Sequence, residues 1–229
     1  MTSDPIVYGP EADRFRRRGG LADEVAAYVR GLILTGSLKP GTKIDQDAIC
    51  EALGVSRSPV REAIVILGQE GLLDVTPRRG ASVAQLTPDD IVDHYALVGA
   101  VAGRAAAMAA VQLDEERVER LGEIHERFAD GTDLTASELS ALNDRFHQII
   151  HGCAPRRTRW LLRLLVRSVP ADYYEFADGW NARAVGHHAE ILDAIRRRDA
   201  DAARDAMRHH LHESGVAAVE ALRVRGFWE

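Results

Sequence analysis

The sequence has few of the features that mark secreted or membrane-bound proteins. Its 229 residues include only two cysteines, Cys50 and Cys153, which are too few and too far apart for a disulfide framework. No apolar run approaches the ~20 residues that cross a bilayer. Residues 1–10 lack the charged start and apolar block of a signal peptide. These absences exclude a disulfide-stabilised extracellular module and favour a cytoplasmic protein without a membrane partner.

The most informative segment, residues 54–64, is typical of the turn and second helix of a helix-turn-helix. Gly54 can adopt the positive φ that ends a helix, and Ser56 is a good N-cap. Pro59 falls in the first turn, where a missing N–H costs nothing. Three apolar residues then recur at helical spacing and are expected to face a small core: Val60, Ile64 and Leu67.

Arg57 and Arg61 lie one turn apart on a different face of this helix. They project from its N-terminal end, which is the end that enters the major groove in helix-turn-helix proteins. Two arginines on a surface helix are more often solvated, but the whole segment favours contact with DNA.

Two more helices and a short hairpin complete a winged unit. Helices are expected at residues 21–33 and 45–53, and strands at 72–75 and 81–84. Pro77-Arg78-Arg79-Gly80 joins the strands, which gives the wing a basic tip. Glycine lets a backbone approach phosphates closely, so Arg78, Arg79 and Gly80 are expected to contact DNA.

The charge distribution agrees with this assignment. The net charge is −6, but basic and acidic residues balance up to residue 85, so the acidic excess lies wholly in the remainder. Residues 1–16 are predicted to form a mobile basic N-terminal arm. The basic run Arg14 to Gly20 either touches DNA phosphates or is simply solvated.

The motifs resemble the N-terminal domain of the GntR family of bacterial transcription regulators, over residues 17–85. The resemblance rests on Leu38-x-Pro40-Gly41, Gly54-Val55-Ser56-Arg57-Ser58-Pro59-Val60-Arg61-Glu62-Ala63, Leu67-x-x-x-Gly71-Leu72-Leu73 and Pro77-x-x-Gly80. It implies a homodimer on a double-stranded palindromic operator. The implied contacts are Arg57 and Arg61 to bases or phosphates, and Ser56 and Ser58 to the DNA backbone, with Gly80 at the wing tip. Asp47 departs from the family, in which some members carry a DNA-contacting arginine at that place.

A second domain is predicted over residues 86–229. Thr87 is expected to cap a helix that has Pro88 at its first position, with Asp90 closing a capping box. Beyond it the periodicity is helical, with helices expected at about 88–111, 114–129, 135–151, 155–169, 172–198 and 199–223. The sequence therefore predicts a mainly α protein, a winged helix-turn-helix followed by an all-α bundle of six or seven helices.

Three histidines of the bundle share helix faces with apolar residues: His147, His188 and His210. Neutral imidazoles from three helices suit a divalent transition metal, with Asn143 as a weak oxygen ligand one turn before His147. The alternative is three separate core histidines, each satisfied by its own hydrogen bond. Four other histidines compete with them in register: His151, His187, His209 and His212.

The bundle is similar to the FCD domain of the FadR-like branch of the GntR family, over about residues 88–225. The resemblance rests on Leu142-Asn143-Asp144-Arg145-Phe146-His147, His188-x-x-Ile191-Leu192-Asp193-Ala194-Ile195 and Met207-x-x-His210-Leu211. It implies a metal held by Asn143, His147, His188 and His210, and a small carboxylate effector held by that metal. Zinc is expected, with nickel and manganese as alternatives. Asn143 replaces the commoner aspartate, which removes one negative charge.

Gly99 and Gly103 are a second departure, because the family's first bundle helix usually carries an arginine and a glutamate at these places. An arginine there would hold an effector carboxylate bidentately, which glycine cannot do. Close packing is expected to compensate for the cost of two glycines in a helix. The pocket is either larger and less charged, or another arginine enters it. The candidates are Arg104, Arg163 and Arg167, each of which is more often a solvated residue.

The sequence therefore predicts a DNA-binding transcription regulator, a repressor, whose operator affinity is set by a carboxylate-type metabolite at or near a metal. Two alternatives stay open, a metal-dependent hydrolase or lyase and a constitutive repressor with a structural metal only. An enzyme needs a general base near the metal, but Glu190 and Asp193 are expected to point away from the face of His188. No catalytic residue is therefore expected.

Overall fold

The computed structural model describes residues 20–168 and 180–228, which fall into two compact units. The first unit ends at Leu86 and also takes in Arg225–Glu229, and the second is Thr87–Val224. The grouping of the last residues with the first unit differs from the predicted domain boundaries. The expected N-terminal arm, residues 1–16, and the expected helix start near residue 172 lie outside the described residues.

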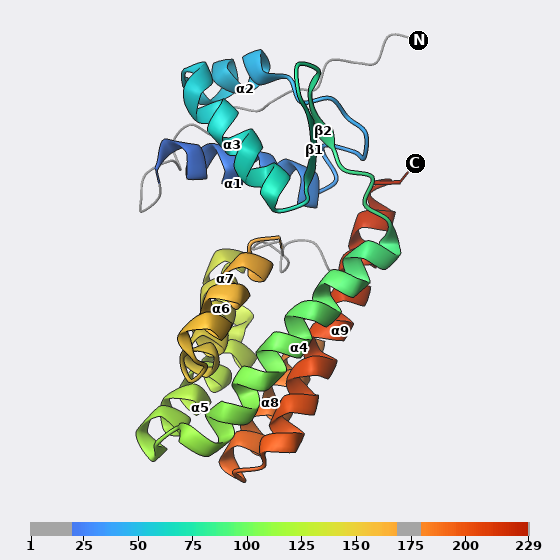
Figure 1. Cartoon of the computed structure of the whole chain (residues 1–229). Helices are drawn as coiled ribbons and strands as arrows, with labels where there is room; N and C mark the ends of the chain where they lie inside the picture. The colour runs from blue at the N-terminus through green and yellow to red at the C-terminus, as the bar shows by residue number, and fades with distance from the viewer. Residues whose placement is uncertain (1–19, 169–179, 229) are drawn as a thin grey trace. The chain divides into compact units, whose positions relative to one another are not determined.

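The first unit is a winged helix-turn-helix, as predicted (Figure 1). Its elements are α1 (Leu21–Leu34), α2 (Gln46–Leu53), α3 (Arg57–Gln69), β1 (Leu73–Thr76) and β2 (Gly80–Val83). The strands are antiparallel, with Leu73 opposite Val83, and each is shifted by one residue from its expected range. Ile33, Leu38, Ile49, Val60 and Leu67 are fully buried and form the core of this unit.

The turn between α2 and α3 has the predicted backbone. Gly54 follows α2 with φ 63°, a left-handed conformation that suits glycine. The Asp45 side chain caps α2 by accepting from the backbone N–H groups of Asp47 and Ala48. Ser56 occupies the N-cap position of α3, but its side chain makes no capping hydrogen bond.

The second unit is an all-α bundle, as predicted. Its described helices are α4 (Pro88–Gln112), α5 (Glu115–Ala129), α6 (Ala136–Gly152), α7 (Arg156–Val166), α8 (Trp180–Arg196) and α9 (Ala200–Val224), with a 3₁₀ turn, η2, at Gly131–Asp133. Thr87 and Asp90 form the expected capping box at α4. Thr135 and Asp114, two other expected caps, accept backbone hydrogen bonds at the starts of α6 and α5.

The long helices α4 and α9 lie side by side (Figure 1) and approach closely at the two glycines. A Cβ atom on Gly103 would lie 2.9 Å from the carbonyl oxygen of Arg204, and one on Gly99 would lie 3.4 Å from Cβ of Leu211. Five alanines continue this buried face of α4: Ala102, Ala105, Ala106, Ala109 and Ala110. The glycines therefore serve close packing, and α9 fills the space that a longer side chain would need.

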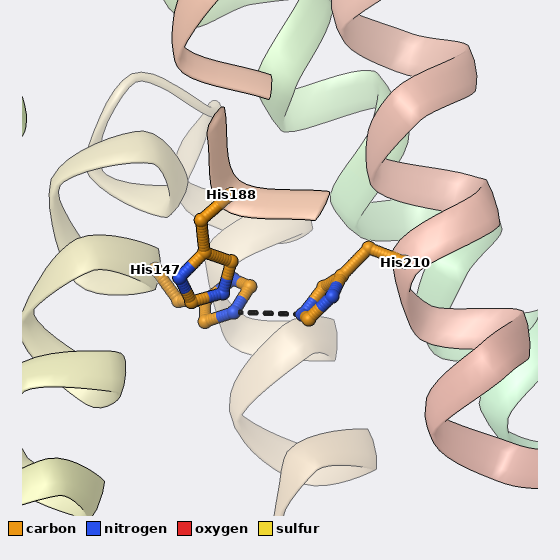
Figure 2. A group of neighbouring side chains, drawn as sticks. All are labelled: His147, His188 and His210. Atoms are coloured by element: carbon orange, nitrogen blue, oxygen red, sulfur yellow. Dashed lines mark hydrogen bonds between the residues drawn. The ribbon is translucent and has the colours of Figure 1, made fainter. Parts of the chain in front are cut away.

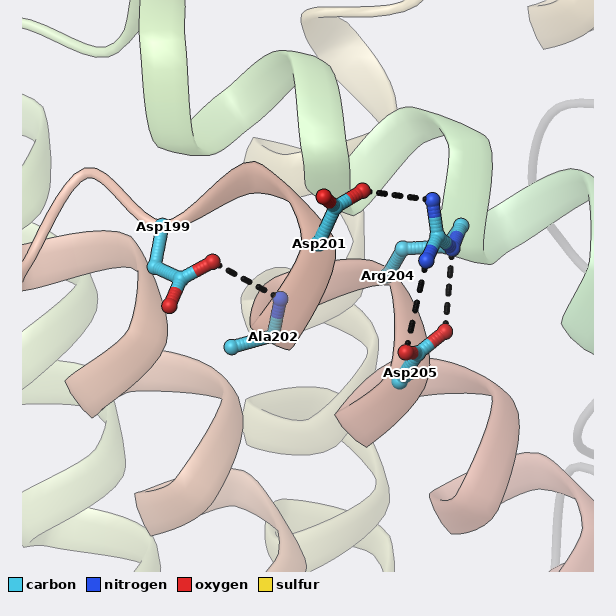
Figure 3. Close-up of polar contacts among 5 residues, drawn as sticks. All are labelled: Asp199, Asp201, Ala202, Arg204 and Asp205. Carbon is cyan, nitrogen blue, oxygen red and sulfur yellow. Dashed lines mark hydrogen bonds and ion pairs between the residues drawn. The ribbon is translucent and has the colours of Figure 1, made fainter.

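Aspartate side chains make a hydrogen bond and ion pairs at the start of α9 (Figure 3). Asp199 accepts a hydrogen bond from the backbone N–H of Ala202, at 3.0 Å. The Arg204 guanidinium lies between Asp201, at 2.6 Å, and Asp205, at 2.9 Å. Arg204, the arginine beside Gly103, therefore pairs with two carboxylates of its own helix.

Helix α4 is long and apolar enough to cross a membrane, by length and composition only. This differs from the expectation that no segment approaches that length. Half of its most apolar window is buried inside the bundle, and the core helix of a soluble protein can pass the same test of length and composition. The helix is therefore weak evidence for a membrane span.

The last residues of the chain pack into the winged unit. Gly226, with φ 64°, turns the chain after α9 ends at Val224. Phe227 is then 1% exposed, and the Trp228 indole donates a hydrogen bond to the Leu86 carbonyl at 2.7 Å. No sequence motif predicted this role for residues 225–228.

Candidate functional site

The first candidate site is the exposed N-terminal end of α3. Arg57 and Arg61 are exposed, and the residues predicted to face the core are buried: Val60, Ile64 and Leu67. The other predicted DNA contacts are exposed too, which leaves them accessible to a duplex: Ser56, Ser58, Arg78, Arg79 and Gly80. An open groove of 490 Å³ runs between the start of α2, the start of α3 and the wing.

Only some of the residues predicted to contact DNA line this groove. Its lining includes Arg57, Arg61 and Gly80, whereas Ser56, Ser58, Arg78 and Arg79 are not among its lining residues. Lys43 also lines it, held there by backbone pairing with Ser82 of β2. Lys43 was not among the predicted contacts, because nothing in the local pattern predicts that residue 43 pairs with the wing.

Asp47 and Arg57 form a bidentate ion pair across the groove. Arg57 donates from Nε and Nη2 to the two Asp47 carboxylate oxygens, at 2.8 and 2.9 Å. Both side chains are about two-thirds exposed, at 63% and 68%. An exposed pair of this kind contributes about 0–1 kcal/mol, so DNA can displace it at little cost. Asp47, which differs from the arginine that some family members carry, therefore pairs with Arg57, a residue predicted to contact DNA.

The second candidate site is a cluster of three imidazoles inside the bundle (Figure 2). His147 comes from α6, His188 from α8 and His210 from α9, and their candidate ligand atoms all lie within 4.8 Å of one another. The Nε2 atoms of His147 and His210 are 3.2 Å apart. The structure confirms the prediction, made from helix register, that these three histidines converge.

Aromatic contacts hold His188 in place. Its ring stacks on Phe146, with centroids 4.3 Å apart and planes 10° from parallel. Phe128 lies on another side, at 5.2 Å between centroids. His188 is fully buried, and neither of its ring nitrogens has a hydrogen-bond partner among the described residues. The alternative in which each core histidine is satisfied by its own hydrogen bond therefore does not hold for His188.

Burial keeps the cluster neutral at pH 7. Desolvation, and then the neighbouring histidines, hold the pKa values of His147 and His188 well below the usual range. The pKa of His210 falls to about 3 for the same reasons. Neutral imidazole nitrogens are transition-metal ligands, and a buried nitrogen without a partner costs about 1–3 kcal/mol. The residues present therefore fit a divalent transition metal.

Carboxylates do not join the cluster in the described part of the chain. Asn143 is half-buried on α6, one helical turn before His147. Burial raises the pKa of Asp144, and a hydrogen bond from Asn143 opposes that shift. Glu190 and Asp193, the two carboxylates expected to point away, are exposed, and Asp193 pairs with Arg197.

A cavity of 400 Å³ opens beside His147, between α6 and α7. Two of the three effector-arginine candidates, Arg163 and Arg167, line it, while Arg104 is exposed on α4 and does not. His151 and Arg159 also line it. His151 was predicted only as a competitor of the three clustered histidines and Arg159 had no predicted role, because helix register alone does not reveal which faces of α6 and α7 meet.

The competing histidines are placed differently from the cluster. His209 and His212 are exposed, and His187 is half-buried at 5.0 Å from the ring of His209. His151 lies 5.7 Å from His147 between ring centroids. The two cysteines, Cys50 and Cys153, are free thiols, as expected.

Each of the two units matches a known protein family. Residues 21–83 match the family of bacterial regulatory proteins called gntR, and residues 93–213 match the FCD domain. A helix-turn-helix transcriptional regulator in an unstable DNA locus of Streptomyces ambofaciens is 31% identical over 195 residues, which cover 82% of this chain and 80% of that protein. The transcriptional repressor RspR of Escherichia coli K12 is 28% identical over 200 residues, 83% of this chain and 86% of the repressor.

Solved structures share the fold. The E. coli protein McbR/YncC superposes with a TM-score of 0.64 at 21% identity, over 89% of this chain and 98% of its own. A GntR family member from Pseudomonas syringae pv. tomato DC3000 gives 0.52 at 24%, over 89% and 86%. With its helix-turn-helix and FCD matches, the chain belongs to the GntR family and is a DNA-binding transcription regulator with a C-terminal FCD domain.

Proposed function

We propose that this regulator reads a palindromic operator as a homodimer, in the cytoplasm. Arg57 and Arg61 enter the major groove, Ser56 and Ser58 contact the phosphate backbone, and the wing tip at Arg78, Arg79 and Gly80 reaches a neighbouring groove. The exposure of all these residues supports the assignment. A dimer places its two recognition helices about one DNA turn, ~34 Å, apart.

The FCD domain acts as the sensor in this proposal. His147, His188 and His210 hold a divalent metal, zinc first and nickel or manganese as alternatives, with Asn143 as a weak fourth ligand. When bound, the metal supplies a positive charge to which a small carboxylate effector binds. The observation that carries the proposal is His188, which is fully buried between aromatic rings with two ring nitrogens that lack partners.

Effector binding changes helix packing in the sensor, and chain connections pass the change to the winged unit. The chain passes between the units after Leu86 and again after Val224. An effector that prefers one form about 100-fold supplies about 2.7 kcal/mol, enough to change operator occupancy. We propose repression in the effector-free state, because RspR, a relative of similar length, is named a repressor.

The test is a DNA-binding titration on the full chain, purified without chelators and analysed for metal content. Operator fragments are selected from a random library, and binding is measured with and without metal and candidate carboxylates. The proposal predicts stoichiometric metal and a shift in operator affinity of about tenfold or more on effector addition. An affinity that never responds to metal or to any carboxylate would favour the constitutive repressor.

Two matched variants assign the site. His210→Ala should lower the metal content, whereas His212→Ala, an exposed histidine on the same helix, should leave it unchanged. Turnover assays against ester, amide and phosphate substrates address the hydrolase or lyase alternative. Hydrolysis that His210→Ala abolishes would overturn the regulatory role of the metal.

A further inference from the structure

Adjacent histidines occur at two places in the bundle, and only one member of each pair belongs to the buried cluster. His187 precedes His188 on α8, and His209 precedes His210 on α9. Because neighbouring residues on a helix point about 100° apart, each pair directs one imidazole into the cluster and the other away from it. The two outer imidazoles, His187 and His209, are called the outer pair below.

The outer pair has the ring spacing of the cluster itself. The ring centroids of His187 and His209 are 5.0 Å apart. Within the cluster (Figure 2) the three centroid distances are 4.8, 5.1 and 5.2 Å. Two imidazoles on one tetrahedral zinc ion, with Zn–N bonds of about 2.1 Å, have ring centroids about 5 Å apart. The outer pair thus has the separation at which two imidazoles share a cation.

The outer pair also extends the cluster toward solvent. His209 is exposed, His187 is half-buried and His210 is 2% exposed. Between centroids, the His187 ring lies 5.0 Å from that of His209 and 5.7 Å from that of His210. A buried metal site needs a path by which the ion enters. These three imidazoles provide one, because a cation that leaves one ring is within reach of the next.

Carboxylates flank the outer pair. Glu190 follows His187 by three residues on α8, and Glu213 follows His209 by four residues on α9. Both spacings bring side chains together on the surface of a helix. The two glutamates act on His187 as negative charges, and Arg183 opposes them. Two carboxylates against one guanidinium make this side of the bundle attractive to cations.

A second approach to the cluster, the cavity beside His147, has charges that are less suited to a cation. Its lining includes Arg159 and Arg163, with Asp144 as the one carboxylate among its described lining residues. Guanidinium groups repel a divalent cation, whereas carboxylates attract it. The charges therefore favour metal entry past the outer pair over entry through the cavity.

The outer pair is suited to capturing a metal and not to storing it. Among the described residues, one set of three or more ligand groups lies close enough together to hold an ion, namely the buried cluster. The outer pair offers two imidazoles and includes an exposed side chain, so water competes with it for the ion. A cation bound there is therefore held more weakly than in the cluster and passes on to it.

We propose that His209 and His187 form an outer capture site for a divalent transition metal, from which the ion passes to His210 and the buried cluster. This inference rests on the proposed metal site and adds the route by which that site is filled. Glu190 and Glu213 raise the local concentration of the cation. The outer pair thus sets the rate of metal uptake and not the amount bound at equilibrium.

Stopped-flow mixing of the metal-free full chain with zinc measures the rate of uptake, and metal analysis after desalting measures the amount bound. His187→Ala and His209→Ala should each slow uptake by about tenfold, the low end of the gain from a guided approach. The zinc content at saturation should stay that of the natural chain. His212→Ala, an exposed histidine of α9 outside the outer pair, should take up zinc at the natural rate.

Natural uptake rates in both outer variants would overturn the proposal. His209 is exposed, so His209→Ala carries the test if His187→Ala fails to fold. His151→Ala tests entry through the cavity, because His151 lines it and lies 5.7 Å from His147 between ring centroids. Slower uptake in this variant alone would also overturn the proposal.

Charge variants test the carboxylates. Glu213→Gln should slow uptake a few-fold at low salt and have no effect at high salt, because screening removes the attraction. Glu220→Gln, an exposed glutamate of the same helix, changes the net charge equally and should leave the rate unchanged. Equal slowing by both variants would show that net charge alone attracts the ion, and would contradict the role of Glu213.

Metal content separates the two levels of the proposal. If the natural chain retains stoichiometric zinc but the outer variants take it up equally fast, only the entry route fails. If the natural chain retains no zinc, the proposed metal site itself fails.

Discussion

The two units place their functional side chains in opposite environments. On the winged unit, Arg57 and Arg61 are exposed, and the ion pair of Arg57 with Asp47 is solvated and of small energy. In the bundle, His188 and His210 are buried and neutral, and His188 has no hydrogen-bond partner within the described residues. Changes at the first site should therefore alter affinity for DNA with little effect on folding, whereas the second site couples ligand binding to stability.

Acidification should produce the largest difference between the units. The folded-state pKa is about 3 for His210 and about 4 for His151, below the usual value near 6.5, because burial disfavours the charged ring. The unfolded chain therefore binds more protons below pH 6.5, and stability is lost as pH falls from about 6.5 toward 4. Each such histidine contributes a slope of about 1.4 kcal/mol per pH unit.

Chemical denaturation of the metal-free chain between pH 7.5 and 4.5 measures this slope. Added metal should restore stability at pH 5.5, since the cation competes with protons for the same nitrogens. His212→Ala should not change the profile. A free energy of unfolding that stays flat from pH 7 to 5 would contradict the buried, neutral cluster.

Replacing His188 with leucine should separate metal binding from folding. His188→Leu should abolish metal-dependent stabilisation, about 2.7 kcal/mol at 100 times the dissociation constant. Without metal its stability should stay within about 1 kcal/mol of the natural chain, because an apolar side chain replaces two unsatisfied nitrogens. Thermal unfolding with and without zinc measures both quantities, and His209→Leu is the exposed control. Normal metal stabilisation of His188→Leu would remove His188 from the site.

On the winged unit, Arg61→Ala should weaken operator binding by about 1–3 kcal/mol while the melting temperature stays within about 2 °C. The arginine is exposed and has no resolved partner to lose among the described residues. Gel-shift titration with operator and with a scrambled duplex measures the affinity and the specificity. An equal loss on both duplexes would make Arg61 a phosphate contact and not a reader of bases.

The smallest effect is expected at Asp47. Asp47→Asn should leave stability within about 0.5 kcal/mol, because the pair with Arg57 is exposed. It should raise DNA affinity a few-fold and steepen the salt dependence by about one counterion, since Arg57 becomes free for a phosphate. Fluorescence anisotropy at several salt concentrations measures the slope. An unchanged slope would show that Asp47 and Arg57 stay paired on DNA.

Much of both units follows from local sequence signals. Gly54 predicts the turn, Thr87 with Asp90 predicts the start of α4, and the apolar spacing around His147, His188 and His210 predicts which side chains face inward. These signals depend on residues within one or two helical turns of one another. Periodicity shows which face of a helix points inward. Because the bundle has one common core, the three histidines could be predicted to meet there.

Contacts between particular helix faces could not be assigned in this way. Arg159 and Arg163 have the pattern of solvated arginines on an amphipathic helix, and only the packing of α7 on α6 shows that they line a cavity with His147. The pairing of Asp47 with Arg57 joins side chains of α2 and α3, and the sequence analysis treated the two residues separately. Phe227 and Trp228 could not be assigned to the winged unit for the same reason.

Because residues 225–228 belong to the winged unit, the chain crosses between the two units twice, after Leu86 and again after Val224. Trp228, hydrogen-bonded to Leu86, fixes one attachment beside the other. An affinity tag fused at either end of this chain would therefore be attached to the DNA-binding unit and not to the FCD domain.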